Sequence, residues 1–159
     1  MKIVLVAVGQ KIPSWAQEAC DEYHKRFPSD WRVEIKTIKT PSRSGGKKAE
    51  TLMTLEAERI NAIVAASAHN PYLVLFDEHG KQQTTVQLAQ SLKKIDGLGH
   101  DIALVIGGPD GLDAALKKSA RETWGLSLLT LPHAMARVLV VEQLYRAWSI
   151  LANHPYHRE

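Results

Sequence analysis

The sequence has almost no cysteine, which limits both its redox chemistry and its compartment. Its 159 residues contain a single cysteine, Cys20. One cysteine cannot form a disulfide within the chain, so the fold does not depend on an oxidising compartment. The neighbouring Asp21 and Glu22 would raise the pKa of the thiol and make it a poor nucleophile. We therefore interpret Cys20 as a small buried hydrophobe.

Long hydrophobic runs are also absent. The apolar start at residues 1–8 is shorter than the apolar region of a signal peptide. The longest largely apolar segment, residues 134–152, is interrupted by charged and amide side chains, whereas a spanning helix needs about 20 apolar residues. We expect a cytoplasmic protein without a membrane segment.

The common motifs for phosphates and metals are missing as well. No Gly-x-Gly-x-x-Gly follows the first apolar segment, where a dinucleotide-binding fold carries it. A Walker A motif needs Lys-Ser/Thr after its last glycine, but Leu112 and Asp113 follow Gly111. His154 and His157 lack the further ligands that a zinc site requires. The sequence therefore supports neither an NAD enzyme, a P-loop NTPase nor a metal site.

The charge is moderate and unevenly spread. The net charge of +3 and the isoelectric point of about 9.0 are weak evidence for a nucleic-acid partner. One segment, residues 32–48, gathers cations against the single acid Glu34, and these cations are Arg32, Lys36, Lys39, Arg43, Lys47 and Lys48. The sequence favours a solvated loop with a lysine-rich rim, and a phosphate-contacting patch is the alternative.

What the sequence does have is an alternation of strand and helix patterns. With 45% hydrophobic residues, the chain can form a single domain, 1–159, around a substantial core. Ser14 and Gln17 fit a capping box at the start of the first helix, and residues 77–81 fit a turn. The expected strands are 3–8, 32–38, 72–76, 102–106 and 126–130, and the expected helices are 14–27, 49–68, 85–95, 113–121 and 134–152. This order predicts an α/β fold, a mainly parallel sheet with helices on both faces.

A glycine-rich loop, Gly107-Gly108-Pro109-Asp110-Gly111, directly follows the apolar strand at 102–106. Glycines at the end of a buried strand suit either a tight turn or a place where the backbone approaches a ligand, and the residues alone do not separate these two interpretations. Ligands of open α/β sheets bind at the carboxyl ends of the strands. We therefore expect the end of strand 72–76, the loop 107–111 and residues 126–133 to converge there.

Several motifs, in chain order, are similar to those of one known family. They are Val6–Gly9, Glu22-Tyr23 with Arg26-Phe27-Pro28, Leu104–Gly111, Leu128–His133, Val141–Ala147 and His154–Glu159. In these motifs the chain resembles the RlmH family, the large-subunit (23S) ribosomal RNA pseudouridine N3-methyltransferases of the SPOUT class. The resemblance covers essentially the whole chain.

This resemblance implies a SPOUT-type fold with a C-terminal trefoil knot, a homodimer, and S-adenosyl-L-methionine as cofactor. Phe76 stands where the family is expected to have leucine, and Asp110 stands where glutamate is common. The family's cofactor-binding positions fall here on Phe76, Gly107, Gly108, Leu126, Ser127, Leu128, Leu129, Thr130 and Leu131.

The implied reaction is in-line methyl transfer to N3 of a pseudouridine, which must lose its imide proton. The candidate catalytic residues are His133, Arg146, Tyr156, His157 and Arg158. His133 equally fits a capping or core-edge histidine. Arg146 fits either a plain ion pair with Glu142, four residues earlier, or a position at the dimer seam. The tail residues suit a splayed base and its phosphate, and the resemblance implies that they bind this substrate across the dimer.

Two other classes of function stay open from the sequence. The first is a non-catalytic, ribosome-associated RNA-binding protein with the same fold. The second is an enzyme of another class that uses the glycine loop for a nucleotide or phosphometabolite. Because a small domain with little basic surface would bind free RNA weakly, we expect the substrate to be ribosomal RNA in the assembled ribosome.

Overall fold

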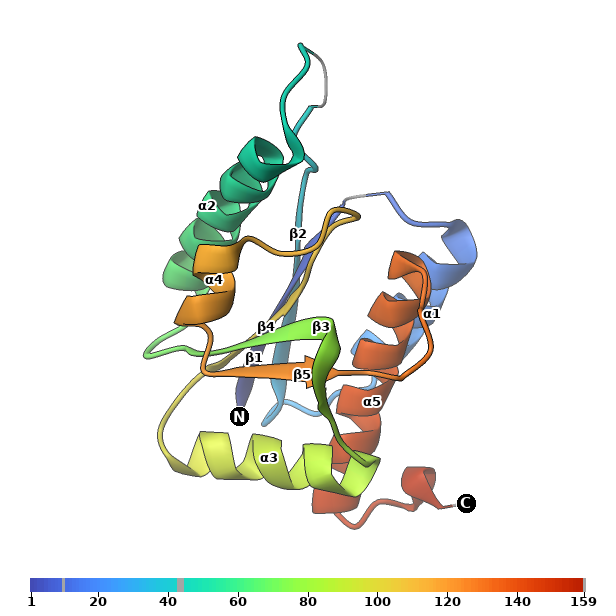
Figure 1. Cartoon of the computed structure of the whole chain (residues 1–159). Coiled ribbons are helices and arrows are strands. Elements are labelled where there is room, and N and C mark those ends of the chain that lie inside the picture. The colour runs from blue at the N-terminus through green and yellow to red at the C-terminus, as the bar shows by residue number, and fades with distance from the viewer. Residues whose placement is uncertain (10, 43–44, 159) are drawn as a thin grey trace.

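The computed structural model describes residues 1–9, 11–42 and 45–158, so Arg43 of the predicted basic segment lies outside the described residues. Strands and helices alternate along nearly the whole chain (Figure 1). They are β1 (Lys2–Val8), α1 (Ser14–His24), β2 (Arg32–Ile38), α2 (Ala49–Ser67), β3 (Tyr72–Gln82), α3 (Thr85–Gly97), β4 (Ile102–Ile106), α4 (Ala114–Ser119), β5 (Glu122–Gly125), α5 (His133–Leu151) and a terminal 3₁₀ turn, η1 (Pro155–His157).

The five strands form one sheet in the order β2-β1-β4-β3-β5, and every pair of neighbours is parallel. All residues of β4 are buried, as the continuous apolar run predicts for a central parallel strand. The alternating strand β2 lies at an edge, where one of its sides faces water. The predicted parallel sheet is therefore confirmed.

Helices cover both faces of this sheet, and the two-residue period of the strands divides the core between them. Ile3 and Leu5 of β1 pack in the cluster that contains residues of α1, α3 and α5. Val4 and Val6 point the other way, into the cluster with α2 and α4. Figure 1 shows α2 and α4 on one side of the sheet and α1 and α5 on the other. Within the described residues, no helix is both long enough and apolar enough to cross a membrane.

Cys20 lies inside the first of these clusters and is 3% exposed. Burial raises the pKa of its thiol, and Asp21 adds to the increase while Arg137 opposes it. The interpretation of Cys20 as a small buried hydrophobe is confirmed.

The predicted capping box at Ser14 is wrong. Pro13 occupies the N-cap, and its carbonyl accepts hydrogen bonds from the N–H groups of Ala16 and Gln17. Gln17 instead directs its amide toward Asp21, with Nε2 donating to Oδ1 at 2.9 Å. A capping box does form at α3, where Thr84 and Gln87 hydrogen-bond reciprocally.

The last strand is also misplaced by the sequence. The structure places β5 at Glu122–Gly125, and residues 126–130 form a loop in which Leu128 is 90% exposed. Trp124 supplies the reason, because it is fully buried and its indole N–H donates to Glu122 Oε2 at 2.6 Å. Tyr72 donates to the other oxygen of Glu122 at 2.8 Å and thereby fixes β5 against β3.

The segment predicted as a turn at 77–81 lies within β3, but its pairing is irregular. Both Phe76 and Lys81 pair with Trp124, so the residues between them bulge out of the ladder. The N–H of His79 donates to Asp77 Oδ1 at 2.9 Å, which is a local turn inside the bulge. This bulge brings Asp77 and its neighbours to the carboxyl edge of the sheet.

Candidate functional site

A cleft of about 670 Å³ lies at the carboxyl edge of the sheet. Its walls come from three segments: the end of regular pairing in β3, the glycine loop after β4, and the loop between β5 and α5. Their convergence confirms the sequence-based expectation. Parallel strands end at the same edge, so the loops that follow them necessarily meet there.

The proposed cofactor residues are largely gathered in this cleft. Those that line it are Phe76, Gly107, Gly108, Leu126, Ser127, Leu129 and Leu131. Leu128 and Thr130 belong to the same loop but do not line the cleft. Ser127 shapes that loop, because its hydroxyl accepts a hydrogen bond from the N–H of Leu129 at 2.9 Å.

The glycine loop is packed too tightly for side chains. A Cβ on Gly107 would lie 2.7 Å from Leu112 Cδ2, and one on Gly108 would lie 3.0 Å from Val8 Cγ1 and 3.2 Å from Glu56 Oε1. Gly111 has a φ of +82°, which favours glycine. The loop is thus a tight turn whose backbone lines a cleft, and the approach of a ligand to it stays a prediction.

The rim of the cleft is acidic. Asp77, Glu78 and Asp110 line it, with Lys117 as the one lysine or arginine among the described lining residues. Lys117 lies 3.1 Å from Asp77. Burial alone would raise the pKa of Asp77, but the N–H of His79 and the charge of Lys117 outweigh it, so the pKa is lowered and the carboxylate stays ionised. Such a rim suits a cationic ligand better than a phosphate.

His133 begins α5 and lines the cleft, and both of its ring nitrogens are engaged. Nδ1 lies 3.2 Å from the carbonyl oxygen of Gly107, and Nε2 lies 2.9 Å from Arg137 Nη2. Burial lowers the pKa of His133, Arg137 lowers it further, and the bond to Gly107 only partly offsets them. The ring is therefore neutral near pH 7, and its lone pair is occupied by Arg137.

The other candidate catalytic residues gather at the far end of α5. Arg146 donates from Nε to Glu142 Oε1 at 2.9 Å, and its guanidinium carbon lies 4.9 Å from the centre of the Tyr156 ring. Tyr156 donates its hydroxyl to the same Glu142 oxygen at 3.0 Å. The ion pair that sequence analysis considered is thus present and extended to the tail. Burial, together with the bonds to Tyr23 and Glu142, raises the pKa of Tyr156, so its hydroxyl keeps its proton.

The tail folds back onto α5 rather than extending into water. His157 Nδ1 lies 3.1 Å from Ser149 Oγ, and the His154 ring lies 4.9 Å from the Trp148 ring. Arg158 is exposed at the end of η1. The arrangement leaves Arg158 available to a partner molecule, while Tyr156 and His157 are held in place.

These two groups of candidate residues are far apart within one chain. Arg146 follows His133 by thirteen residues on the same straight element, a rise of about 20 Å along the helix. The structure therefore assembles the cofactor candidates at one end of α5 and the tail candidates at the other. A single reacting atom cannot touch both groups in one protomer.

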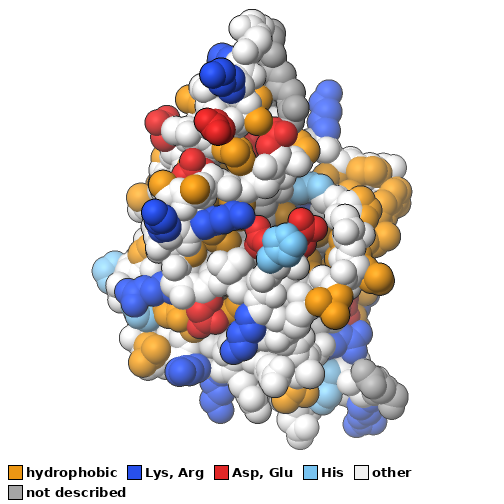
Figure 2. Space-filling view, viewed as in Figure 1, with side chains coloured by type: hydrophobic (Ala, Val, Ile, Leu, Met, Phe, Trp, Pro, Cys, Tyr) orange, Lys and Arg blue, Asp and Glu red, His pale blue; other side chains and the backbone are white. Residues whose placement is uncertain are grey.

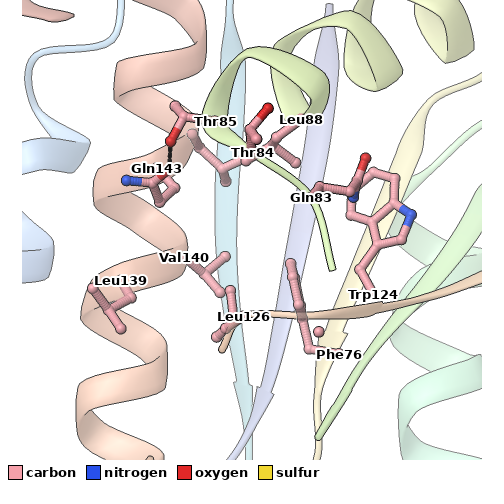
Figure 3. Close-up of a pocket in the computed structure, with 12 residues that line it drawn as sticks. Phe76, Gln83, Thr84, Thr85, Leu88, Trp124, Leu126, Leu139, Val140 and Gln143 are labelled. Atoms are coloured by element: carbon pink, nitrogen blue, oxygen red, sulfur yellow. Dashed lines mark hydrogen bonds between the residues drawn. The ribbon is translucent and has the colours of Figure 1, made fainter. Parts of the chain in front are cut away.

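A second pocket, of about 270 Å³, lies between α3, β5 and α5 and was not foreseen from the sequence (Figure 3). Phe76 and Leu126 line both this pocket and the cleft. On its α5 side, Thr85 donates its hydroxyl to Gln143 Oε1 at 2.7 Å. The pocket thus lies behind the wall of the cleft.

The predicted basic segment does not form an isolated cationic surface. Lys36 lies 3.7 Å from Glu34, and Arg59 donates to the carbonyl of Lys39 at 2.6 Å. On the face shown in Figure 2, Lys and Arg side chains are interspersed with acidic ones. No group of three or more His, Cys, Asp or Glu side chains in the described part of the chain is arranged to hold a metal ion.

Arg137 is the site residue that sequence reasoning missed. It is one of the charged side chains that interrupt the apolar segment 134–152, and its spacing of four from His133 places the two side chains on one face of a helix. Asp77 and Lys117 were also missed, because their pairing joins β3 to α4 across 40 positions of sequence.

Comparison with known proteins gives a consistent result. A family described as "Predicted SPOUT methyltransferase" matches residues 1–157. The ribosomal RNA large subunit methyltransferases H of Methylibium petroleiphilum and Variovorax paradoxus are each 55% identical over 159 residues, covering 100% of both chains. A probable methylase family protein from Haemophilus influenzae has a similar structure, with a TM-score of 0.57, 15% identity, and coverage of 97% of this chain and 67% of that one.

Proposed function

The chain belongs to the SPOUT methyltransferase family, and on that premise we propose that it transfers a methyl group from S-adenosyl-L-methionine to large-subunit ribosomal RNA. The observation that carries this proposal is the full-length similarity to two proteins named as methyltransferases of that RNA. The proposed unit is one domain, 1–159, acting in the cytoplasm, where bacterial ribosomes are made.

The cleft fits S-adenosyl-L-methionine in its chemistry. Phe76, Leu126 and Leu131 offer apolar walls to an adenine ring, and the backbone of Gly107 and Gly108 can approach it because glycine has no side chain. The acidic rim favours the positive sulfonium and ammonium groups of this cofactor. When bound, the cofactor supplies an electrophilic methyl group. The described residues thus offer a binding site without the basic cradle that a phosphate would need.

The proposed target atom is N3 of a pseudouridine in 23S ribosomal RNA, a proposal that the resemblance of the motifs supports. The imide at N3 must lose a proton, so groups that stabilise the developing anion are required. We propose Arg146 and Arg158 for that role. Tyr156, which keeps its own proton, suits stacking or hydrogen-bond donation, and His157 is held beside it by Ser149.

We propose that the active site is completed by a second copy of the chain. The separation of about 20 Å between the cleft and Arg146 supports this arrangement, because the tail of one protomer cannot reach its own cleft. In a two-fold dimer, each cleft would meet the tail of the partner subunit, giving two shared sites. The C-terminal trefoil knot expected of the family remains a prediction.

The experiment that tests this function compares three substrates with S-adenosyl-L-methionine carrying a labelled methyl group. We expect transfer to assembled ribosomes and little to a short naked 23S fragment, because the small and charge-mixed surface gives weak binding to free RNA. Small ribosomal subunits are the control. Binding to ribosomes without any transfer would favour the non-catalytic RNA-binding protein, and efficient methylation of the naked fragment would contradict the need for the ribosome.

A further inference from the structure

We propose that Arg137 is a positioning residue that sets the shape of the cofactor loop by acting through His133. The inference rests on the proposed function in one respect, that the cleft holds S-adenosyl-L-methionine. Arg137 itself does not line the cleft, so it acts through its neighbours.

Arg137 is unusual because it is a buried cation without a buried anion. It is 2% exposed, and among the described residues no carboxylate pairs with it. Its Nη2 donates to the carbonyl of Gly9 at 2.6 Å and to His133 Nε2 at 2.9 Å, while its Nε is buried with no hydrogen-bond partner in the described structure. Burying a guanidinium this way is costly, so a core position with such a residue calls for an explanation beyond packing.

The contact with Arg137 decides which nitrogen of His133 carries the proton. A guanidinium has five donors and no acceptor, so Nε2 must be the acceptor in this hydrogen bond. The proton of the neutral ring therefore lies on Nδ1, and Nδ1–H donates to the carbonyl of Gly107 at 3.2 Å. Without Arg137, either tautomer could form, and the Nε2–H tautomer would turn a lone pair toward that carbonyl.

The carbonyl of Gly107 in turn fixes a peptide plane in the cleft wall. The peptide joining Gly107 to Gly108 is planar and trans, so the N–H of Gly108 points opposite to the carbonyl of Gly107. Peptides between two glycines rotate with little steric resistance, and both residues line the cleft. Holding this carbonyl therefore sets the direction of the Gly108 N–H in the cleft wall.

The charges around Arg137 and His133 agree with a neutral His133 ring that is held in one tautomer. Burial and the charge of Arg137 both lower the pKa of His133, and Cys20 of α1 is the titratable group that faces Arg137. No carboxylate of the described chain contributes to the pKa of either side chain. Gly9 after β1, Gly107 after β4 and the start of α5 are thus joined by one hydrogen-bonded chain.

The test measures cofactor affinity and the state of the His133 ring in parallel. We expect Arg137→Met to weaken binding of S-adenosyl-L-methionine by about tenfold, the worth of one hydrogen bond from a charged group. Arg137→Lys, which keeps a cationic donor, restores most of that affinity. The matched control is Arg59→Met, which also removes an arginine bonded to a backbone carbonyl but lies away from the cleft, and it should bind as the wild type does.

Nitrogen NMR measures the tautomer and the pKa of the His133 ring. Both would stay unchanged in Arg137→Met if Arg137 only stabilised the fold. The wild type should show an Nδ1–H neutral ring, and Arg137→Met should show a mixture of both tautomers and a higher pKa of His133. In a His133→Asn background, where no tautomer exists, Arg137→Met should cost much less affinity than it does alone. Additive losses, or an unchanged tautomer in Arg137→Met, would overturn the proposal.

Two further outcomes stay distinguishable. If the folded wild type binds no S-adenosyl-L-methionine, the proposed cofactor is wrong, but the ring nitrogens still report whether Arg137 sets the tautomer. If Arg137→Met does not fold, Arg137→Lys and His133→Asn carry the test. In that case the proposal is supported if His133→Asn loses its affinity for the cofactor and the His133 ring of Arg137→Lys keeps the wild-type tautomer. The proposal is overturned if His133→Asn binds the cofactor as the wild type does and the His133 ring of Arg137→Lys shows a mixture of tautomers.

Discussion

Gly107→Val is expected to lower the affinity for S-adenosyl-L-methionine by about 100-fold or more, because overpacked side chains force the surrounding atoms apart. The Cβ alone would lie 2.7 Å from Leu112 Cδ2 and 2.8 Å from its Cγ, and the two methyl groups of valine need further space at the cleft wall. Calorimetric titration of wild type and variant with the cofactor measures the effect. The far-ultraviolet circular dichroism spectrum shows whether the variant is folded.

The matched control is Gly97→Val at the last residue of α3. A Cβ there meets nothing within 4 Å, so the same substitution adds bulk without touching the cleft. We expect wild-type cofactor affinity and a small loss of stability from the β-branched side chain. Equal binding by Gly107→Val and the wild type would mean that the glycine loop does not hold the cofactor.

Arg146→Ala is expected to lower the rate of methyl transfer by about 10²–10⁴-fold, the range for a group that assists proton loss or stabilises developing charge. Its cofactor affinity should stay at the wild-type value, since Arg146 lies about 20 Å along α5 from the cleft. Single-turnover rates with ribosomes and calorimetric titration measure the two quantities. Arg121→Ala is the control, because Arg121 also lies over a tyrosine ring, at 5.6 Å from the centre of the Tyr72 ring, but directly before β5 and outside the tail residues.

Mixing the two defective chains tests whether the site is shared. If protomers exchange, a mixed dimer of Gly107→Val and Arg146→Ala contains one intact cleft facing one intact tail, so equal mixing restores about a quarter of the wild-type rate. Each variant alone stays inactive. No recovery, with mixed dimers demonstrated by mass spectrometry, would place both groups of residues in one protomer's site and contradict the proposed arrangement.

Local patterns were sufficient for most of the fold, and failed where a distant contact decides the structure. The apolar run of β4 and the alternation in β2 predict the central position of β4 and the edge position of β2 correctly. A strand buried on both faces is apolar throughout, whereas a strand buried on one face alternates between apolar and polar residues. The strand expected at 126–130 lies instead at Glu122–Gly125, because the burial of Trp124 and the bond from Tyr72 to Glu122 fix the pairing. No local pattern contains that contact.

The candidate site divides in the same way. The glycines after β4 mark the cleft because a strand ending in glycines is a local signal, and most residues transferred by the family resemblance do line it. The hydrogen bonds from Arg137 through His133 to Gly107 could not be predicted from the sequence, because they join α5 to a loop 26 positions earlier. The distance between the cleft and Arg146, by contrast, follows from the helix that the sequence predicts at 134–152, and the structure confirms that helix as α5.

The most direct measurement is the identification of the nucleoside that receives the methyl group. Ribosomes lacking the modification would be incubated with the purified protein and S-adenosyl-L-methionine carrying a deuterated methyl group, and the 23S RNA would be digested to nucleosides for mass spectrometry. The account predicts the label in N3-methylpseudouridine and in no other nucleoside, with Gly107→Val giving none. A label in another nucleoside, or none from folded protein that binds the cofactor, would contradict it.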